Sequence, residues 1–244
     1  SGITVERNGV QEVNLDNVAL QLPSGVSLTG PLSAAIGAGQ RILVAGPSGC
    51  GKSTLFRAIA GIWPYGSGSI AIPADAAMLF LPQRSYLPIG SLRGAVSYPL
   101  PHDTYTDDDI VRYFSMCRLD HLAGRLDDLD NWSQRLSPGE QQRLAFVRML
   151  LIRPDIVFLD EATSAMDGDT EAALYSLLAE QLSASTIVSI AHRETVAQYH
   201  DVRWQFVADG AQAADGGWRY RIDASVLPAA GQDFASHASA RRTQ

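Results

Sequence analysis

The chain has 244 residues, of which 46% are hydrophobic and 18% are charged, and its formal net charge at pH 7 is -7. This length is enough to bury the core of one large domain or two small ones. The acidic balance excludes a nucleic-acid binder that works through a broad basic surface. No apolar run approaches the roughly 18–20 residues of a membrane-spanning helix, so the sequence indicates an ordinary globular domain.

The ends and the cysteines of the chain add two expectations. The chain begins with Ser1-Gly2 rather than with methionine and shows no signal peptide, so we expect a fragment of a longer protein. Its two cysteines, Cys50 and Cys117, are too few for a disulfide framework. Cys50 lies inside a glycine-rich loop, which indicates a reducing compartment.

The first third of the chain is predicted to be rich in strands. A turn at Pro23-Ser24-Gly25 separates two short alternating runs, as in a hairpin. A continuous apolar run at residues 41–45, typical of a buried parallel strand, leads into the glycine-rich loop and a helix. The predicted elements are strands Val18–Leu22, Val26–Leu28, Arg41–Ala45 and Ala77–Leu81, and the helix Ser53–Ala60.

The middle of the chain has helical periodicity, and strands return after it. Helices are predicted at Asp107–Cys117, around Leu119–Leu122, at Gly139–Ile152 and at Thr170–Leu182, and strands at Ile156–Leu159, Thr186–Ala191 and Val202–Val207. We interpret this order as an α/β fold whose mostly parallel sheet is interrupted by a helical insertion, roughly from Arg84 to Pro154. The segment from Ala229 onward is rich in Ala, Ser and Gln and is predicted to be a disordered tail.

The glycine-rich loop matches G-x-x-x-x-G-K-[ST], the motif that wraps nucleotide phosphates. It consists of Gly46, Pro47, Ser48, Gly49, Cys50, Gly51, Lys52, Ser53 and Thr54. Its backbone N–H groups and the positive end of the following helix favour an anion. Lys52 is the only lysine of the chain, and we expect it to reach the β- and γ-phosphates while the Ser53 hydroxyl binds Mg²⁺.

A second element, the apolar strand at residues 156–159, ends in Asp160 and Glu161. Ligands of open α/β folds bind at the carboxyl ends of the strands. Asp160 therefore suits the role of a residue that binds Mg²⁺ through a water molecule or supports its direct ligands. Glu161 could polarise the attacking water. The alternative is that Asp160 only caps the next helix and Glu161 is solvated.

A third element is the start of a helix at residues 136–143. Ser137 at the N-cap, Pro138 at the first helical position and Glu140 at the third form a capping box. Such a helix start, with a serine and the bare backbone of Gly139, is also an anion site. Because the phosphate loop already has its own helix end, this second site most simply serves a nucleotide held by another copy of the chain.

Taken in order, these motifs resemble the nucleotide-binding domain of ABC transporters over nearly the whole chain. The matching pieces are the phosphate loop, Gln83 after a strand, the signature at residues 136–140, the acidic strand end at residues 156–161, Ser164-Ala165-Met166-Asp167, and His192. The resemblance implies a P-loop NTPase of the RecA-like type with an N-terminal antiparallel β subdomain and an inserted helical subdomain. The implied ATPase domain is residues 1–228, with its core at 1–83 and 155–228, the helical subdomain at 84–154, and the tail at 229–244.

The resemblance also implies roles for single residues, with ATP and Mg²⁺ as cofactors. Gln83 would contact Mg²⁺ and the attacking water and couple to a membrane domain. Ser137 and Gly139 would bind the γ-phosphate held by the other subunit, His192 would contact that phosphate, and Asp167 would lie at the dimer contact. The implied catalytic residues are Glu161, His192, Lys52 and Gln83, and the implied metal ligands are Ser53, Gln83 and Asp160.

The implied partners are a transmembrane domain, N-terminal in the same full-length chain, and a second copy of the ATPase domain, with no nucleic acid. The implied location is the cytoplasmic face of a membrane, which in a bacterium would be the inner membrane. Residues 81–93, Tyr98-Pro99, Asn131-Trp132 and residues 137–143 look like subfamily D and its bacterial uptake relatives. That branch includes peroxisomal fatty acyl-CoA transporters and bacterial carriers of peptides and other bulky solutes.

The sequence departs from the family pattern at three positions. Leu22 stands where many members of the family stack an aromatic ring on adenine. In proteins that bind single-stranded nucleic acids, such stacking contributes about 1–3 kcal/mol per base. We therefore expect modest affinity for ATP and a small preference for ATP over GTP. Pro138 replaces a commoner glycine and Met166 a commoner leucine, and neither is an inferred ligand.

Two alternatives remain open to the sequence. The first is a soluble ABC-type ATPase that acts in translation or repair. Translation proteins of this kind carry two cassettes, and repair proteins insert a long coiled coil, for which the segment from Arg84 to Arg135 is too short. The second is a nucleotide-gated binding module without turnover, which would require a lost catalytic residue, although Glu161 and His192 are both present.

Overall fold

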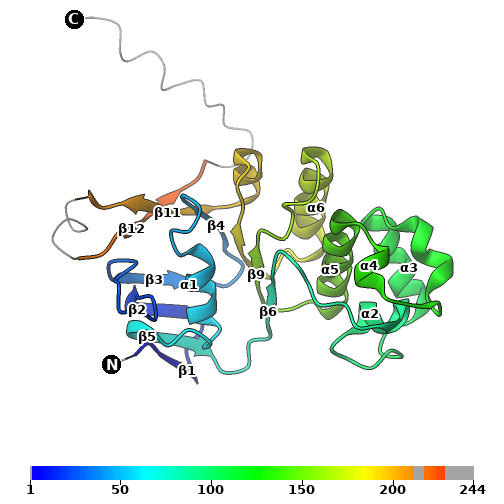
Figure 1. The fold of residues 1–244 in the computed structure, drawn as a ribbon, viewed down its shortest axis with the longest axis horizontal. Helices are drawn as coiled ribbons and strands as arrows, with labels where there is room; N and C mark the ends of the chain where they lie inside the picture. Colours follow the sequence, from blue (N-terminus) through cyan, green and yellow to red (C-terminus); the bar gives the residue numbers. More distant parts are fainter. Residues whose placement is uncertain (1, 211–216, 229–244) are drawn as a thin grey trace, which may run out of the picture.

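The computed structural model describes residues 2–210 and 217–228, so the predicted tail at 229–244 lies outside the described residues. Two sheets form the body of the protein (Figure 1). The larger has the order β12-β11-β4-β10-β9-β6, and the smaller has the order β1-β5-β2-β3. The strands of the larger sheet are β4 (Arg41–Ala45), β6 (Met78–Leu81), β9 (Ile156–Asp160), β10 (Thr186–Ile190), β11 (Val202–Ala208) and β12 (Tyr220–Val226).

The larger sheet is parallel except for β12, which pairs antiparallel with β11. All five residues of β10 and the first four of β9 are buried. Burial on both faces explains why these strands are continuous apolar runs rather than alternating ones. The mostly parallel sheet and the strands predicted near residues 41, 77, 156, 186 and 202 are therefore confirmed.

The smaller sheet contains β1 (Thr4–Asn8), β2 (Val13–Leu20), β3 (Leu32–Ile36) and β5 (Gly66–Pro73). β2 pairs antiparallel with β3 and β5, whereas β1 pairs parallel with β5, so the sheet is mixed. The predicted turn at residues 22–26 is present, with Leu22 N–H donating to Val26 O over 2.9 Å. The predicted strand Val26–Leu28 is reduced to a single bridge between Gln21 and Ser27. The ladder does not continue, because Leu20 N–H donates to the side-chain oxygen Thr29 Oγ1, while Leu20 O accepts from the N–H groups of both residue 28 and residue 29.

Helix α1 (Lys52–Ile59) follows the glycine-rich loop and joins both sheets. Its buried side chains, Leu55, Phe56 and Ile59, belong to one apolar cluster that contains residues of β2, β5, β4 and β9. Phe56 meets Phe158 of β9 edge to face, with ring centroids 5.1 Å apart. The start of α1 is thereby fixed relative to the carboxyl ends of the parallel strands.

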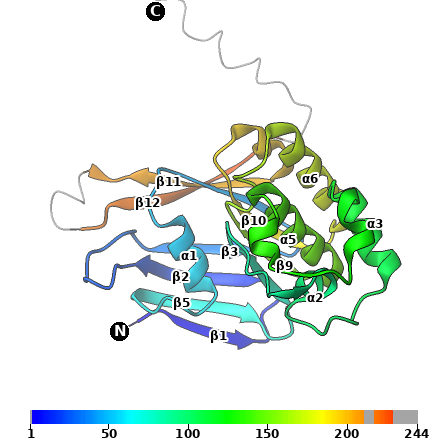
Figure 2. The ribbon, with the colours of Figure 1, turned by 45° about the vertical axis from the view of Figure 1, so that its right-hand side comes forward.

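The segment between β6 and β9 is mainly helical and lies together beyond the β6 edge of the larger sheet (Figures 1 and 2). Its elements are β7 (Gly90–Ser91), α2 (Leu92–Ser97), α3 (Asp107–Met116), η1 (Asp120–Arg125), β8 (Leu129–Asp130), α4 (Trp132–Arg135) and α5 (Pro138–Ile152). Trp132 is completely buried here and donates its indole N–H to Gly90 O over 3.0 Å. Helix α6 (Gly168–Gln181) and η2 (Glu194–Tyr199) contribute side chains to the same apolar cluster as α5.

In the part of the chain that the structure describes, no helix has both the length and the apolar character needed to cross a bilayer. Both cysteines are free and buried. Burial raises the pKa of the Cys117 thiol to about 12, and it also raises the pKa of Cys50. Both thiols are therefore protonated and unreactive at neutral pH.

His200 is a buried histidine behind β10. Its Nδ1 lies 2.8 Å from Val196 O and must donate to it, so Nε2, at 2.9 Å, accepts from the Ser189 hydroxyl. Burial is the main cause that lowers the pKa of His200 to about 4; Arg41 and Arg203 also lower it, against the raising effects of the bond to Val196 and of nearby Asp201. The side chain is therefore neutral in the folded protein at pH 7.

This pKa shift predicts a loss of stability in mild acid. An unfolded histidine has a pKa near 6.5 and gains a proton as the pH falls, while folded His200 does not, so the unfolded state is favoured. The contribution is complete above pH 6.5 and is lost between about pH 6.5 and 4, to a total of about 3 kcal/mol. Urea unfolding of wild type and of His200→Gln should show a steeper pH dependence in the wild type, with exposed His102→Gln as control. Equal slopes would contradict the assignment.

Candidate nucleotide-binding and hydrolysis site

The phosphate loop joins β4 to α1 and depends on glycine at two positions. Gly46 has φ 148° and Gly51 has φ 110°, a region that side chains disfavour. A Cβ on Gly46 would lie 2.6 Å from Phe206 Cβ, and one on Gly51 would lie 2.6 Å from Leu28 Cδ2. The two glycines are therefore required for both the backbone angles and the space, which the tight wrapping of a phosphate also needs.

The predicted lysine lies over this loop. Lys52 Nζ donates to Gly46 O and to Pro47 O, each over 2.8 Å, and only 6% of the residue is exposed. The ammonium is thus held at the loop by carbonyl oxygens of the same loop. We expect phosphate oxygens to replace one or both of these acceptors when a nucleotide binds.

Ser53 and Asp160, which are far apart in the sequence, meet at the end of the larger sheet. The Ser53 hydroxyl donates to Asp160 Oδ1 over 2.9 Å, and burial raises the pKa of the Asp160 carboxyl. A hydroxyl and a carboxylate are the hard oxygen ligands that Mg²⁺ prefers, so this pair fits the ion. No group of three or more His, Cys, Asp or Glu among the described residues could hold a metal by itself. The remaining ligands would therefore include oxygens of the nucleotide and of water.

Glu161 and His192 form a second pair at the same sheet edge. Glu161 Oε1 lies 2.8 Å from His192 Nε2, because β9 and β10 are neighbouring parallel strands that end at the same level. Glu161 has φ 53°, and its N–H donates to Ile190 O over 3.1 Å. This left-handed backbone turns its side chain away from the direction of Asp160. The arrangement places a carboxylate where it can accept a proton from water, and an imidazole beside it.

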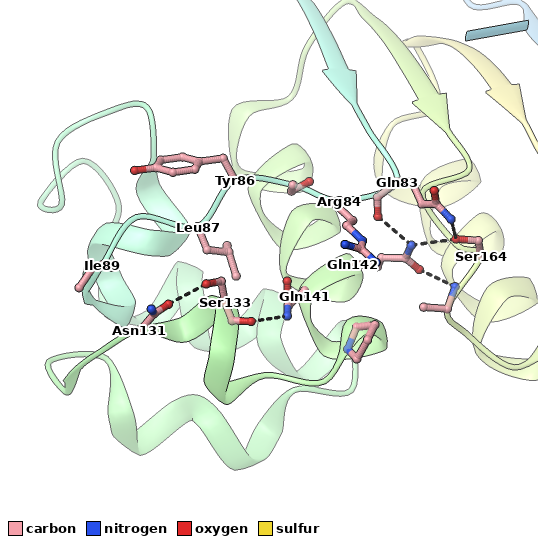
Figure 3. A pocket seen from close by; sticks show the side chains of 13 residues that line it. Gln83, Arg84, Tyr86, Leu87, Ile89, Asn131, Ser133, Gln141, Gln142 and Ser164 are labelled. Carbon is pink, nitrogen blue, oxygen red and sulfur yellow. Dashed lines mark hydrogen bonds between the residues drawn. The ribbon is translucent and has the colours of Figure 1, made fainter.

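Gln83 was predicted to join the metal ligands, and the structure shows its side-chain amide nitrogen bonded to another segment of the chain. Its Nε2 donates to Ser164 Oγ over 3.1 Å (Figure 3). The structure therefore brings Ser53 together with Asp160 and Glu161 together with His192, while the side chain of Gln83 bonds to the segment that follows Glu161. Its contact with Mg²⁺ stays a prediction.

The predicted capping box at the start of α5 is confirmed. Glu140 N–H donates to Ser137 Oγ over 3.2 Å, and Ser137 N–H donates to Glu140 Oε2 over 2.8 Å. Burial raises the pKa of Glu140, but the bonds from Ser137 and from His121 outweigh it and hold this pKa below its usual value. A Cβ on Gly139 would lie 3.1 Å from Ala165 O, so glycine allows α5 to approach the segment 161–167 closely.

Within the described residues, no hydrogen bond joins Ser137 or Gly139 to the phosphate loop of their own chain. They line a hollow of about 560 Å³ together with Met166 and Asp167. Asp167 caps α6, accepting from Thr170 N–H over 2.8 Å and from its hydroxyl over 3.0 Å, and these bonds lower the pKa of Asp167. Capping is thus its role within this chain, and the dimer contact stays a prediction.

Two buried residues of α5 were missed by the sequence analysis. Gln142 and Arg148 are 5% and 8% exposed. Arg148 donates from Nε to Ala95 O and from Nη1 to Tyr86 O, each over 2.7 Å, and so fixes α5 to the segment after Gln83. No sequence signal separates Gln142 from its neighbour Gln141; only the position of α5 in the fold does so.

A groove of about 810 Å³ separates the segment after Gln83 from the start of α5 (Figure 3). Its lining includes Arg84, Leu87 and Asn131, and it carries two large exposed apolar side chains, Tyr86 at 64% and Ile89 at 76%. Leu129, on the neighbouring strand β8, is 79% exposed. A grouping of exposed apolar side chains around a groove is typical of a protein-binding surface.

Comparison with known proteins agrees with this geometry. The family described as ABC transporter matches residues 29–164. An ABC transporter ATP-binding protein of Haemophilus influenzae is 40% identical over 193 residues, 79% of this chain and 32% of its own length. ABC transporter D family member 2, chloroplastic, of Arabidopsis thaliana is 34% identical over 258 residues, 86% of this chain and 36% of its own.

A solved structure, a bacterial Atm1-family ABC exporter with ATP bound, superposes with a TM-score of 0.72 at 28% identity. It covers 84% of this chain, and the match covers 38% of the exporter chain. The chain therefore spans about a third of the length of the curated relatives it matches. Together, the family match and the fold show that this chain belongs to the ABC transporter family, as the ATP-binding and ATP-hydrolysing domain of that family.

Proposed function

We propose that two copies of this domain close head to tail around two MgATP and that hydrolysis powers solute movement through a transmembrane domain. The observation that carries the proposal is the separation of two half-sites. Lys52, Ser53 and Glu161 lie at one end of the larger sheet, whereas Ser137 and Gly139 lie at the start of α5 and form no hydrogen bond with any of them in the described residues. A helix start that can bind phosphate but is not bonded to its own phosphate loop would be complete when a second copy supplies the nucleotide.

Each residue of the first half-site then has a chemical task. Glu161 accepts the proton of the attacking water, and His192, at 2.8 Å, orients that carboxylate and stabilises the developing charge of the γ-phosphate. Lys52 exchanges its loop carbonyls for phosphate oxygens. Ser53 and Asp160 would hold Mg²⁺, which when bound neutralises charge on the phosphates, and Gln83 would join them through its side-chain oxygen.

The groove beside Gln83 supports the second half of the proposal. The exposed side chains of Tyr86, Ile89 and Leu129 give a membrane domain an apolar surface to contact. The groove begins at Gln83 itself, so a shift of the bound segment would reach the nucleotide site directly. We propose that the helical subdomain spans residues 84–154 and forms this contact.

The remaining parts of the proposal concern the whole protein. The transmembrane domain would precede this domain in the same full-length chain, the two copies would be identical, and the domain would lie on the cytoplasmic face of a bacterial inner membrane. The similarity to ABC transporter D family members supports the branch that the sequence analysis associates with carriers of peptides and other bulky solutes. No comparison favours a soluble ATPase of repair or translation.

The proposal is tested by the dependence of ATPase activity on protein concentration. If each site needs two copies, phosphate release per molecule should rise with concentration and level off only when the dimer saturates. The activity should also require Mg²⁺. A specific activity that stays constant from nanomolar to micromolar protein, with a monomer seen by sedimentation throughout, would overturn the shared site.

A further inference from the structure

The side chain of Gln142 joins three separate segments of the protein. It points from the second turn of α5 towards Gln83 and the loop after Glu161 (Figure 3). Its Nε2 donates to Gln83 O over 3.0 Å and to Ser164 Oγ over 3.1 Å, and it also lies 3.4 Å from Glu161 O. Its Oε1 accepts from Ala165 N–H over 2.9 Å.

These partners allow only one orientation of the Gln142 amide. The carbonyl oxygens of Gln83 and Glu161 can only accept, and Ala165 N–H can only donate. A flipped amide would place oxygen against oxygen and N–H against N–H in a buried site, where unpaired polar groups are costly. Gln142 therefore sets the distance between α5 and both the Gln83 segment and the Glu161–Ala165 loop.

Ser164 extends this constraint to the side chain of Gln83. The Ser164 hydroxyl oxygen accepts from Gln142 Nε2 and from Gln83 Nε2, each over 3.1 Å. With its nitrogen bound to Ser164, Gln83 has its Oε1 as the free end of the amide. An oxygen is the atom that Mg²⁺ or the hydrogens of a water molecule require.

We propose that Gln142, acting through Ser164, is a positioning residue that orients the Gln83 amide with its oxygen available to the catalytic site. This inference rests on the proposed function, which gives Gln83 its role beside Mg²⁺ and water. Ser137 caps α5 and Gly139 lies in its first turn, and these two residues form the half-site that the chain would offer to its partner. The bonds of Gln142 therefore link that half-site to Gln83, which belongs to the half-site that the chain itself uses. The bonds of Gln142 and Ser164 are to protein groups, so we expect both residues to act on the geometry of Gln83.

The chain offers a matched control on the same helix. Gln141 Nε2 donates to Ser133 O over 2.8 Å and to Leu136 O over 2.9 Å, so its bonds stay within the helical part of the protein. The variants are Gln142→Met, Ser164→Ala and the control Gln141→Met. Ser164 is exposed, so its variant removes the hydroxyl without opening the core and remains informative if Gln142→Met fails to fold.

The first measurement uses the nucleotide-free protein and needs no metal. The side-chain amide resonances of Gln83, assigned by their loss in Gln83→Ala, should move to the positions of a solvent-exposed glutamine in Ser164→Ala and in Gln142→Met. They should stay in place in Gln141→Met. Unmoved Gln83 resonances in Ser164→Ala would overturn the inference.

The second measurement separates binding from turnover. We expect kcat at saturating MgATP to fall about 10–100-fold in Gln142→Met and Ser164→Ala, the size of effect that a misplaced catalytic group produces. The Kd for a fluorescent ATP analogue in EDTA and the urea midpoint of Ser164→Ala should not change. Adding Ser164→Ala to Gln83→Ala should lower kcat no further, because both act through the same side chain.

The outcomes distinguish this inference from the proposed function. A multiplicative loss in the Gln83→Ala, Ser164→Ala double variant would show that Ser164 does not act through Gln83 and would overturn the inference. Wild-type kcat in Ser164→Ala, beside an impaired Gln83→Ala, would also overturn it while leaving the proposed function intact. Wild-type kcat in Gln83→Ala itself would instead remove the role of Gln83 from the proposed function.

Discussion

Replacing Glu161 by glutamine should stop ATP turnover and leave nucleotide binding intact. The amide has the shape of the carboxylate but cannot accept a proton from water, and a positioned general base typically contributes about 10²–10⁴-fold to a rate. Lys52, the glycine loop and the Ser53–Asp160 pair are unchanged in this variant, so the affinity for ATP should persist. Phosphate release measures the first effect, and titration of a fluorescent ATP analogue measures the second.

This variant should also accumulate the closed dimer. If hydrolysis reopens the two copies, a chain that binds MgATP without cleaving it should elute as a dimer in size-exclusion chromatography with ATP. Glu180→Gln, the same change at an exposed position on α6, is the matched control and should behave as wild type. Turnover at the normal rate in Glu161→Gln would reject its assigned role as the base.

Mixing two inactive variants should restore activity if each site is shared between two copies. Lys52→Ala removes the phosphate-binding ammonium, and Gly139→Asp places a carboxylate where the γ-phosphate of the partner would lie. In a mixed dimer, the intact loop of the second variant faces the intact helix start of the first, so one complete site forms. Random pairing should give about a quarter of the wild-type rate, because about half of the dimers are mixed and each has one of two sites.

The Gly139→Asp substitution is compatible with the fold at the start of α5. An acidic residue in the first turn of a helix is favourable to the helix dipole, and the added Cβ meets Ala165 O at 3.1 Å, which requires a shift of a few tenths of an ångström. The control mixes two differently tagged Lys52→Ala chains, in which no complete site can form. Failure of the first mixture to regain activity, with mixed dimers demonstrated by the tags, would contradict the shared site.

Much of the site was predictable because its motifs are local in the sequence. The conformation of the phosphate loop follows from the spacing of Gly46, Gly49 and Gly51, and the capping box of Ser137 and Glu140 spans a single helical turn. The buried strands were equally clear, since β9 and β10 are continuous apolar runs. The strands β1, β3, β5 and β12 were missed, because each contains exposed residues rather than a continuous apolar run, and such strands depend on their neighbours.

The sequence by itself determined the chemistry of this protein: a loop that binds phosphate, an acidic pair at the end of a buried strand, and a second helix start suited to an anion. Only the tertiary structure decided which of these groups meet. The bond between Glu161 and His192 depends on the pairing of β9 with β10, and the inward position of Gln142 beside the outward-bonded Gln141 depends on how α5 packs. Such contacts join residues distant in the chain, and their geometry is set by the burial of whole elements rather than by any local pattern.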